Sequence, residues 1–288
     1  MQRSMMLLVI LVLLTGCAAE IEADQPLHVM LVNDDGVDSP GLAALAEALT
    51  ADPGYRVTVV APHDQQSAAG HALVIRREIA IRPHPAVGGA TAVSVDATPA
   101  SVTAIGLTVV LEQDPPDLVV SGINKGENVG RAAWYSGTVG AAREAVLRGV
   151  PAIALSLELD WDDPKPDWTG AARLAKPVVD AVRSRGLPDG IVLNVNVPRD
   201  TAAARGYRIT SMGMTPDEVS RYAIDRVEDG VRYVTSRWAP PDGAAEGSDV
   251  TALDAGFVPL TPLTLDQTAY TALAPLAQLE LTIPPAAP

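Results

Sequence analysis

The chain has 288 residues, of which 48% are apolar, and its formal charge at pH 7 is −14. This length is typical of one large domain or of one domain with an appendage. A strongly acidic chain is a poor partner for a nucleic-acid polymer, because phosphate backbones are bound by basic surfaces. The charge does not exclude a small phosphorylated substrate that is held by a metal ion and backbone amides.

The N-terminus has the features of a bacterial export signal. A basic residue precedes an apolar run over residues 5–14, and Cys17 follows shortly after it. The run is too short for an ordinary membrane-spanning helix, and the small residues after it resemble a lipoprotein cleavage site. We therefore expect a lipoprotein signal peptide over residues 1–17, a lipid anchor at Cys17 and a tether over residues 18–27. The protein would then be exported to the cell envelope, lipid-anchored or, with an ordinary cleaved signal, periplasmic.

Two adjacent carboxylates follow the first predicted strand. The apolar run 28–32 is typical of a buried strand in a parallel sheet, and Asp34 and Asp35 come directly after it. Neighbouring carboxylates that lose water repel each other unless a cation lies between them. The alternative is that the acids only cap the next helix, but Ser39 and Pro40 already supply a cap and a first-turn proline. The pattern therefore favours a metal site, and oxygen ligands select Mg²⁺, Mn²⁺ or Ca²⁺.

Strands and helices then alternate along the chain until about residue 200. Such alternation predicts a Rossmann-like, doubly wound α/β fold with a mostly parallel sheet over residues 28–200. Residues 201–288 are expected to form an α+β extension or an arm for oligomer contacts. The helix that ends near residue 111 is expected to bury Val102, Ile105 and Val109. The predicted strands are 28–32, 56–61, 118–120, 152–155 and 191–195, with a β excursion over 74–81 and 90–95, and the predicted helices cover about 42–49, 99–111, 138–148 and 169–185.

The carboxyl ends of four predicted strands carry polar or glycine-rich segments. In an open parallel sheet, ligands bind outside these ends. The segments are 33–36, 62–71, 121–130 and the single residue Ser156. One such segment alone is typical of an ordinary turn. Four together, one of them with paired acids, favour a shared site.

A possible phosphate site lies immediately before the predicted helix 138–148. Ser136, Gly137 and Thr138 offer backbone N–H groups at a helix start together with two hydroxyls, which suits an anion. The alternative is a plain helix cap formed by Ser136 or Thr138. Combined with a divalent-cation site on the same sheet edge, phosphate binding predicts phosphoester hydrolysis with metal-activated water as the nucleophile.

Several motifs occur in the order found in one known family. They are Asn33-Asp34-Asp35-Gly36, Gln66-Ser67, Gly70-His71, Thr98-Pro99, Ser121-Gly122-Ile123-Asn124, Tyr135-Ser136-Gly137-Thr138-Val139 and, further on, Asp249 and Thr261-Pro262-Leu263. In this order they resemble the SurE family, the stationary-phase survival proteins that are metal-dependent nucleoside-monophosphate phosphatases. The likeness spans about residues 28 to 270.

The resemblance implies a 5′-nucleotidase, an acid-phosphatase-like phosphomonoesterase that converts nucleoside 5′-monophosphates, and in some cases 3′-monophosphates, to nucleoside and phosphate. It also implies one divalent ion, Mg²⁺ or Mn²⁺, and a homodimer or homotetramer joined by the C-terminal extension. The implied metal ligands are Asp34, Asp35, Ser67 and Asn124, the implied catalytic residues are Asp34, Asp35 and Asn124, and the implied phosphate-binding residues are Ser136, Gly137 and Thr138.

The chain departs from the family pattern beside these motifs. Ala97 replaces the usual glycine before Thr98, and Ala100-Ser101 replaces the usual Asp-Cys. The changes spare the implied metal ligands, so we expect an effect on substrate preference rather than on activity. The alternative function is a non-catalytic, exported nucleotide-binding lipoprotein. A receiver-like phosphoacceptor module is less favoured, because Ser121 and Ser156 stand where its acceptor aspartate would be.

Overall fold

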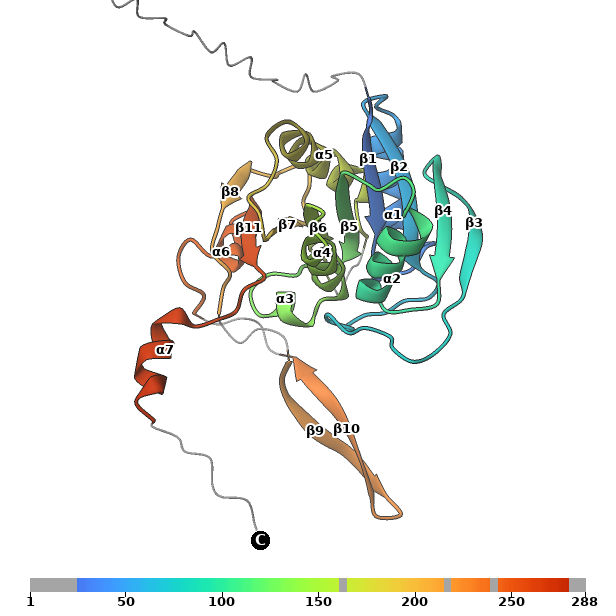
Figure 1. Cartoon of the computed structure of the whole chain (residues 1–288). Helices are drawn as coiled ribbons and strands as arrows, with labels where there is room; N and C mark the ends of the chain where they lie inside the picture. The colour runs from blue at the N-terminus through green and yellow to red at the C-terminus, as the bar shows by residue number, and fades with distance from the viewer. Residues whose placement is uncertain (1–24, 161–164, 215–218, 239–242, 280–288) are drawn as a thin grey trace, which may run out of the picture.

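A nine-stranded sheet forms the centre of the fold in the computed structural model (Figure 1), which describes residues 25–160, 165–214, 219–238 and 243–279. Its strands are β1 (Leu27–Val32), β2 (Tyr55–Pro62), β3 (Ile81–Val87), β4 (Ala90–Val95), β5 (Leu118–Lys125), β6 (Ala152–Leu157), β7 (Ile191–Val197), β8 (Tyr207–Ile209) and β11 (Val258–Thr264). Their order across the sheet is β3-β4-β2-β1-β5-β6-β7-β11-β8, and the run from β4 to β7 is parallel. The predicted α/β fold with a mostly parallel sheet is confirmed.

The start of the chain lies outside this description. The predicted signal peptide, Cys17 and most of the predicted tether fall within residues 1–24, which are not among the described residues. In the described ranges, no helix combines the length and the apolar character that crossing a membrane requires.

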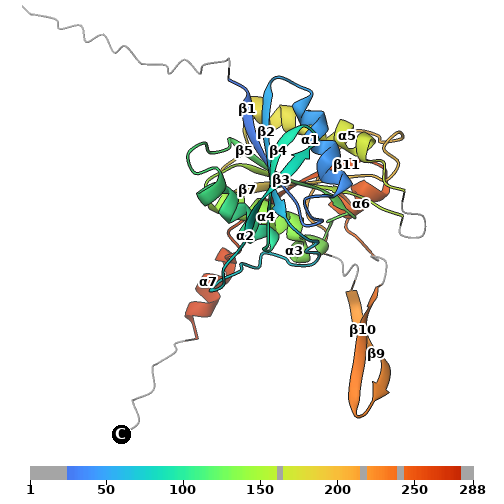
Figure 2. The ribbon, with the colours of Figure 1, turned by 90° about the vertical axis from the view of Figure 1, so that its right-hand side faces the viewer.

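Helices cover both faces of the sheet, as Figures 1 and 2 show. The helices α1 (Pro40–Thr50) and α5 (Trp168–Arg185) pack on one face, and α2 (Pro99–Ile105) and α4 (Gly137–Leu147) pack on the other. Successive side chains of a strand point to opposite faces. In β1, Val29 and Leu31 therefore join the apolar cluster under α1 and α5, whereas Met30 and Val32 join the cluster under α2 and α4.

The direction in which the chain adds strands reverses at β1. From β1 the chain moves to β2 on one side, and it later adds β5, β6 and β7 on the other side. Leu31 accordingly pairs with Val59 of β2 and also with Val120 of β5. Such a reversal leaves a crevice outside the carboxyl ends of the two strands that flank it. Here that crevice lies beyond β1 and β5, where the paired acids and Asn124 are located.

The helix after Thr98 differs from the prediction. It is α-helical only to Ile105 and continues as a π-helical turn over Gly106–Val110, in which the Leu111 N–H donates to the Gly106 carbonyl at 2.8 Å. A π turn adds one residue per turn and breaks the 3.6-residue period. The prediction that Val109 faces inward is therefore wrong: its exposed fraction is 60%, while Leu111 is buried.

Two strand predictions also need correction. Residues 74–80 are not a strand, because β3 begins only at Ile81 and pairs with β4 across a turn at Gly88-Gly89, where both φ angles are positive. The strand β5 is longer than predicted and runs to Lys125, with a register irregularity between Ser121 and Asn124. Asn124 thus belongs to the end of a strand rather than to a loop.

Residues beyond 200 have two different roles. The strand β11 pairs antiparallel with β7 and parallel with β8, so both complete the main sheet. The strands β9 (Val219–Glu228) and β10 (Val231–Trp238) form a separate antiparallel hairpin. The hairpin and the helix α7 (Tyr270–Ala277) project away from the sheet in Figures 1 and 2.

Candidate functional site

Asp34 is buried at the carboxyl end of β1, with an exposed fraction of 4%. The Thr138 hydroxyl donates to Asp34 Oδ1 at 2.6 Å, and a Cβ on Gly137 would lie 2.8 Å from Asp34 Oδ2. Asp34 therefore lies directly against the first turn of α4. Burial raises the pKa of Asp34 to about 6; the Thr138 hydroxyl lowers that pKa and the neighbouring Asp35 raises it.

Asp35 is held by a different element. Its Oδ2 accepts the backbone N–H of Lys125, at the end of β5, at 2.9 Å. Burial raises the pKa of Asp35, and the Lys125 N–H and charge lower it. The side chain is half-buried and borders a cavity on the α1 side of the sheet edge. The two adjacent acids thus have anchors on two different parts of the fold.

The structure brings the other two predicted metal ligands to the same sheet edge. The Gln66 N–H donates to the Asp34 carbonyl at 2.7 Å, which places the loop of Ser67 beside the acids. Ser67 is exposed, and its Oγ accepts a hydrogen bond from Gln65 Nε2 at 3.0 Å. Asn124 donates its Nδ2 to the Gly126 carbonyl at 2.7 Å, which orients the amide and leaves Oδ1 as its acceptor atom.

The chemistry of this donor set fits a hard divalent cation. It comprises two carboxylates, one amide oxygen and one hydroxyl, which are the ligand types that Mg²⁺ and Mn²⁺ prefer. Among the described residues, no group of three or more His, Cys, Asp or Glu side chains is placed to hold a metal ion. The candidate site therefore relies on two acids supplemented by neutral oxygen donors.

Ser136, Gly137 and Thr138 lie at the start of α4, which begins at Gly137, one residue before the predicted helix. Ser136 is the N-cap of α4, and its Oγ accepts the Val139 N–H at 3.0 Å. That bond uses the oxygen as acceptor and leaves the hydroxyl proton for another partner. The Thr138 hydroxyl, in contrast, already donates its hydrogen bond to Asp34. The helix start therefore offers a phosphate the Ser136 hydroxyl and first-turn backbone N–H groups other than those of Val139 and Thr138, which serve Ser136 and Asp34.

A cavity of about 540 Å³ adjoins Asp35 and was not anticipated from the sequence. Trp168, the first residue of α5, forms part of its wall. A Cβ on Gly41 would lie 2.8 Å from the Trp168 ring, so the ring packs closely on the start of α1. No local pattern marks Trp168, because its place in the wall depends on the packing of α5 against α1. Other residues that line the cavity are Asp35, Asp38, Ser39, His63, Asp64, Gln65 and Lys125.

Comparison with known proteins identifies the family. The family model described as "Survival protein SurE" matches residues 29–218. A 5′-nucleotidase SurE from Geotalea uraniireducens is 41% identical over 260 residues, which cover 89% of this chain and 100% of the relative. One from Clostridium beijerinckii is 35% identical and covers 88% of this chain and 99% of the relative. The chain belongs to the SurE family.

A solved structure supports the same assignment. The crystal structure of the SurE protein from Aquifex aeolicus superposes with a TM-score of 0.76 at 34% identity and covers 88% of this chain and 99% of that chain. The similarity to SurE proteins therefore extends over the arrangement of the sheet and helices as well as over the sequence motifs.

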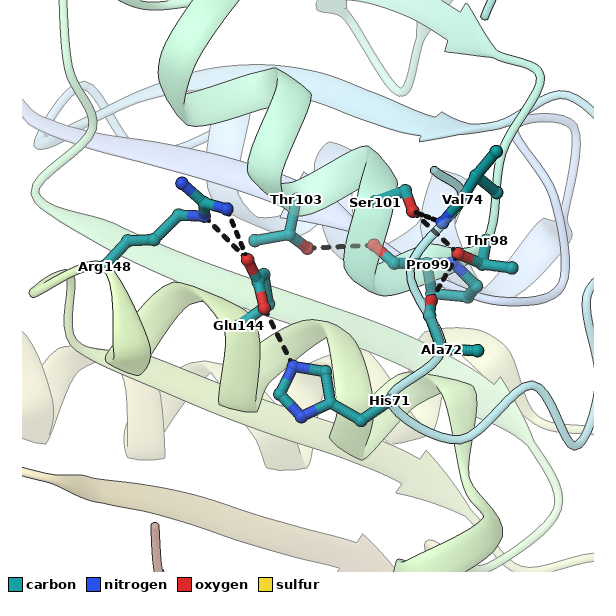
Figure 3. A network of polar contacts seen from close by, with 9 residues as sticks. All are labelled: His71, Ala72, Val74, Thr98, Pro99, Ser101, Thr103, Glu144 and Arg148. Carbon is teal, nitrogen blue, oxygen red and sulfur yellow. Dashed lines mark hydrogen bonds and ion pairs between the residues drawn. The ribbon is translucent and has the colours of Figure 1, made fainter. Parts of the chain in front are cut away.

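One of the departures from the SurE pattern lies in a polar network that fixes the loop after Ser67 (Figure 3), whereas the other two, Ala97 and Ala100, are buried apolar side chains. Ser101, at one of these positions, accepts the Val74 N–H at 2.7 Å and hydrogen-bonds to Thr98 Oγ1 at 2.9 Å. Thr98 in turn donates to the Ala72 carbonyl at 2.5 Å instead of capping α2 with its side chain. The substituted position thus keeps a direct role in holding this loop against α2.

The same loop is tied to α4 by His71. Its Nε2 lies 2.9 Å from Oε2 of Glu144, which is buried, and Arg148 donates its Nε to the other Glu144 oxygen at 2.7 Å (Figure 3). Close backbone packing adds to this contact, since a Cβ on Gly140 would lie 2.1 Å from the Gly70 carbonyl oxygen. His71 therefore connects the Ser67 loop to the helix that faces Asp34, and the described contacts of this histidine are structural.

Buried polar side chains from later strands hold the segment between β5 and α3 (Ala132–Tyr135). Asn128 donates its N–H to Asn196 Oδ1 at 2.7 Å and its Nδ2 to Ser156 Oγ at 2.8 Å, and Asn194 donates to the Asn128 carbonyl at 2.8 Å. Ser156, predicted from the sequence to lie near a shared ligand site, is thus a partner of this network.

Asp249 supplies the corresponding link from the C-terminal region. Its carboxylate is fully buried and accepts the backbone N–H groups of Gly130, Gly213 and Val250 at 2.8–2.9 Å. These bonds lower the pKa of Asp249, but burial has the larger effect and raises it. Asp249 therefore joins the helix α6 (Asp249–Asp254) to the loop that follows β5.

Replacing Asp249 should destabilise this SurE-family protein. Asp249→Ala leaves three buried N–H groups without their acceptor, so we expect the free energy of unfolding to fall by about 2–3 kcal/mol. Asp249→Asn retains one acceptor oxygen and should lose less. Urea unfolding measures both, with Asp254→Ala, an exposed aspartate of the same helix, as the control. An unchanged unfolding midpoint for Asp249→Ala would contradict the role of these bonds.

Proposed function

We propose that this protein is a metal-dependent 5′-nucleotidase that hydrolyses nucleoside 5′-monophosphates, and also nucleoside 3′-monophosphates, to nucleoside and phosphate. The observation that carries the proposal is the buried carboxylate of Asp34, set against the first turn of α4 and next to Asp35. The names of the relatives, 5′-nucleotidase SurE, support the same activity.

The residues expected to hold the ion are Asp34, Asp35, Ser67 and Asn124. When bound, a divalent ion would neutralise phosphate charge and lower the pKa of a bound water. Asp34 and Asp35 contribute the negative charge of the site, and the Thr138 hydroxyl and the Lys125 N–H fix the orientation of the two carboxylates. Asn124 is oriented by its bond to Gly126.

The start of α4 binds and orients the phosphate. Backbone N–H groups of a first helical turn have no partner within the helix, and the helix dipole favours an anion there. The Ser136 hydroxyl can donate to a phosphate oxygen, since its own oxygen is occupied by the Val139 N–H. These donors also stabilise the charge that develops on the phosphoryl oxygens during hydrolysis.

Hydrolysis of adenosine 5′-monophosphate in Mn²⁺ or Mg²⁺ tests this proposal. Asp34→Asn removes a negative charge from the ion site. Loss of a residue that only supports a metal ligand costs up to roughly 100-fold, so loss of a direct ligand should lower kcat/KM by at least roughly 100-fold. A chelator should abolish turnover, and added Mn²⁺ should restore it. Asp189→Asn, at an exposed aspartate away from the site, is the matched control.

The same preparation distinguishes the alternative function. If the unmodified protein releases no more phosphate than Asp34→Asn, the proposal that it is a nucleotidase is contradicted. If calorimetry then showed tight binding of adenosine 5′-monophosphate, the protein would be a nucleotide-binding lipoprotein without turnover.

We also propose a homodimer or homotetramer joined through the C-terminal elements. Several apolar side chains of the hairpin are more than half exposed, among them Tyr222 at 71% and Val227 at 61%. Exposed apolar patches of this kind mark protein interfaces. Light scattering should give a multiple of the mass of one mature chain, and the charge introduced by Ile224→Asp should reduce that multiple. A monomeric unmodified protein would contradict this proposal.

Finally, we propose that the protein is exported and anchored by lipid at Cys17. Support comes only from the sequence of residues 1–17, with an apolar run that ends just before the sole cysteine. In a bacterial host the full chain should incorporate labelled fatty acid and sediment with membranes. Cys17→Ser should carry no label and leave the membrane fraction. Equal labelling of both would contradict anchoring at Cys17.

A further inference from the structure

The cavity beside Asp35 has no role in the phosphate chemistry described above. Its volume of about 540 Å³ lies within the range of small-molecule sites, roughly 300–1,000 Å³. Asp35 and Lys125 both line it, and they are the two residues joined by the bond that orients the Asp35 carboxylate. The cavity is therefore continuous with the candidate ion site on the side opposite α4.

This placement separates the two ends of a phosphoester. The phosphate donors at the start of α4 lie against Asp34, whereas the cavity lies against Asp35. If the phosphate of an ester lies against α4, the leaving group must lie on another side of the acids. The cavity beside Asp35 adjoins the acids and can receive it.

The lining suits an aromatic group that carries hydroxyls. Trp168 provides an aromatic wall, which close packing on Gly41 holds in place. Asp38, Asp64 and Gln65 provide oxygen acceptors for hydroxyl or amino hydrogens. The described residues that line the cavity include three aspartates, Asp35 among them, and one lysine, Lys125, so a second phosphate in it would be repelled. A nucleoside meets these requirements, because it combines a stacking base with a neutral, hydroxyl-bearing sugar.

We propose that this cavity is the leaving-group subsite, in which the base of a nucleoside monophosphate stacks on Trp168 and the sugar hydroxyls face Asp64 and Gln65. This assignment rests on the proposed function, and it specifies the part of the substrate that the phosphate site does not contact. It predicts that the protein binds a free nucleoside in the absence of phosphate and of metal.

Adenosine binding, measured by calorimetry on the metal-free protein, tests the subsite without requiring turnover. Trp168→Leu removes the stacking surface and should weaken adenosine binding by about 10-fold or more, whereas Trp168→Phe keeps an aromatic face and should lose less. Asp64→Ala changes an exposed loop residue of the cavity and should also weaken binding. Glu78→Ala, an exposed acid that does not line the cavity, is the control for Asp64→Ala.

Kinetics on two substrates separate the subsite from general damage. Trp168→Leu should raise KM for adenosine 5′-monophosphate by a clearly larger factor than KM for glycerol 2-phosphate, which has no base to stack. If Trp168→Leu and Asp64→Ala bind adenosine as tightly as the unmodified protein, the assignment is overturned. Equal losses on both substrates, with Trp168→Phe no better than Trp168→Leu, would also overturn it.

The proposed function and the subsite can fail separately. If adenosine binding depends on Trp168 but no phosphoester is hydrolysed, the nucleoside subsite is supported and the proposed nucleotidase activity is contradicted. Hydrolysis of both substrates with no Trp168-dependent adenosine binding would support the enzyme and contradict the subsite.

Discussion

The candidate site depends above all on the burial of one carboxylate at the end of β1. A buried charge is costly unless donors or a cation compensate it, and burial raises the pKa of Asp34 to about 6. The chain meets this demand with the Thr138 hydroxyl and with the start of α4, which approaches closely because Gly137 has no side chain. The contact with Asp34 thereby fixes the position of α4. The helix in turn anchors the loop of Ser67, because Glu144 of α4 contacts His71 of that loop.

The second half of the chain supports a site that lies mainly in the first half. The acids follow β1, and Asn124 ends β5, but the segment after β5 is held by Asn194 and Asn196 of β7 and by Asp249 of α6. Buried polar groups need partners, and each of these amide and carboxylate groups meets backbone N–H or C=O groups of that segment. The strand β7 and the helix α6 therefore help to hold the segment after β5 in place, although none of these three residues lines the cavity beside Asp35.

Local patterns were sufficient to predict most of the parallel strands and their helices, and the Ser39 cap of α1, because these depend on hydrophobic period and capping chemistry. They failed where an element leaves the standard period, as in the π turn that exposes Val109. They also could not assign partners across the fold. The Thr138 hydroxyl was expected to face phosphate and instead donates to Asp34, and Trp168 borders the cavity only because α5 packs on α1.

Asp34 and Asp35 are neighbours in sequence, yet one is anchored to α4 and the other to the end of β5. This division has an evolutionary consequence. A substitution on the α4 side disturbs the partners of a buried charge, whereas a substitution at an exposed residue of the cavity, such as Asp64, does not. A lineage could therefore acquire a new preference among phosphoesters by drift on the Asp35 side, without first passing through an inactive ancestor.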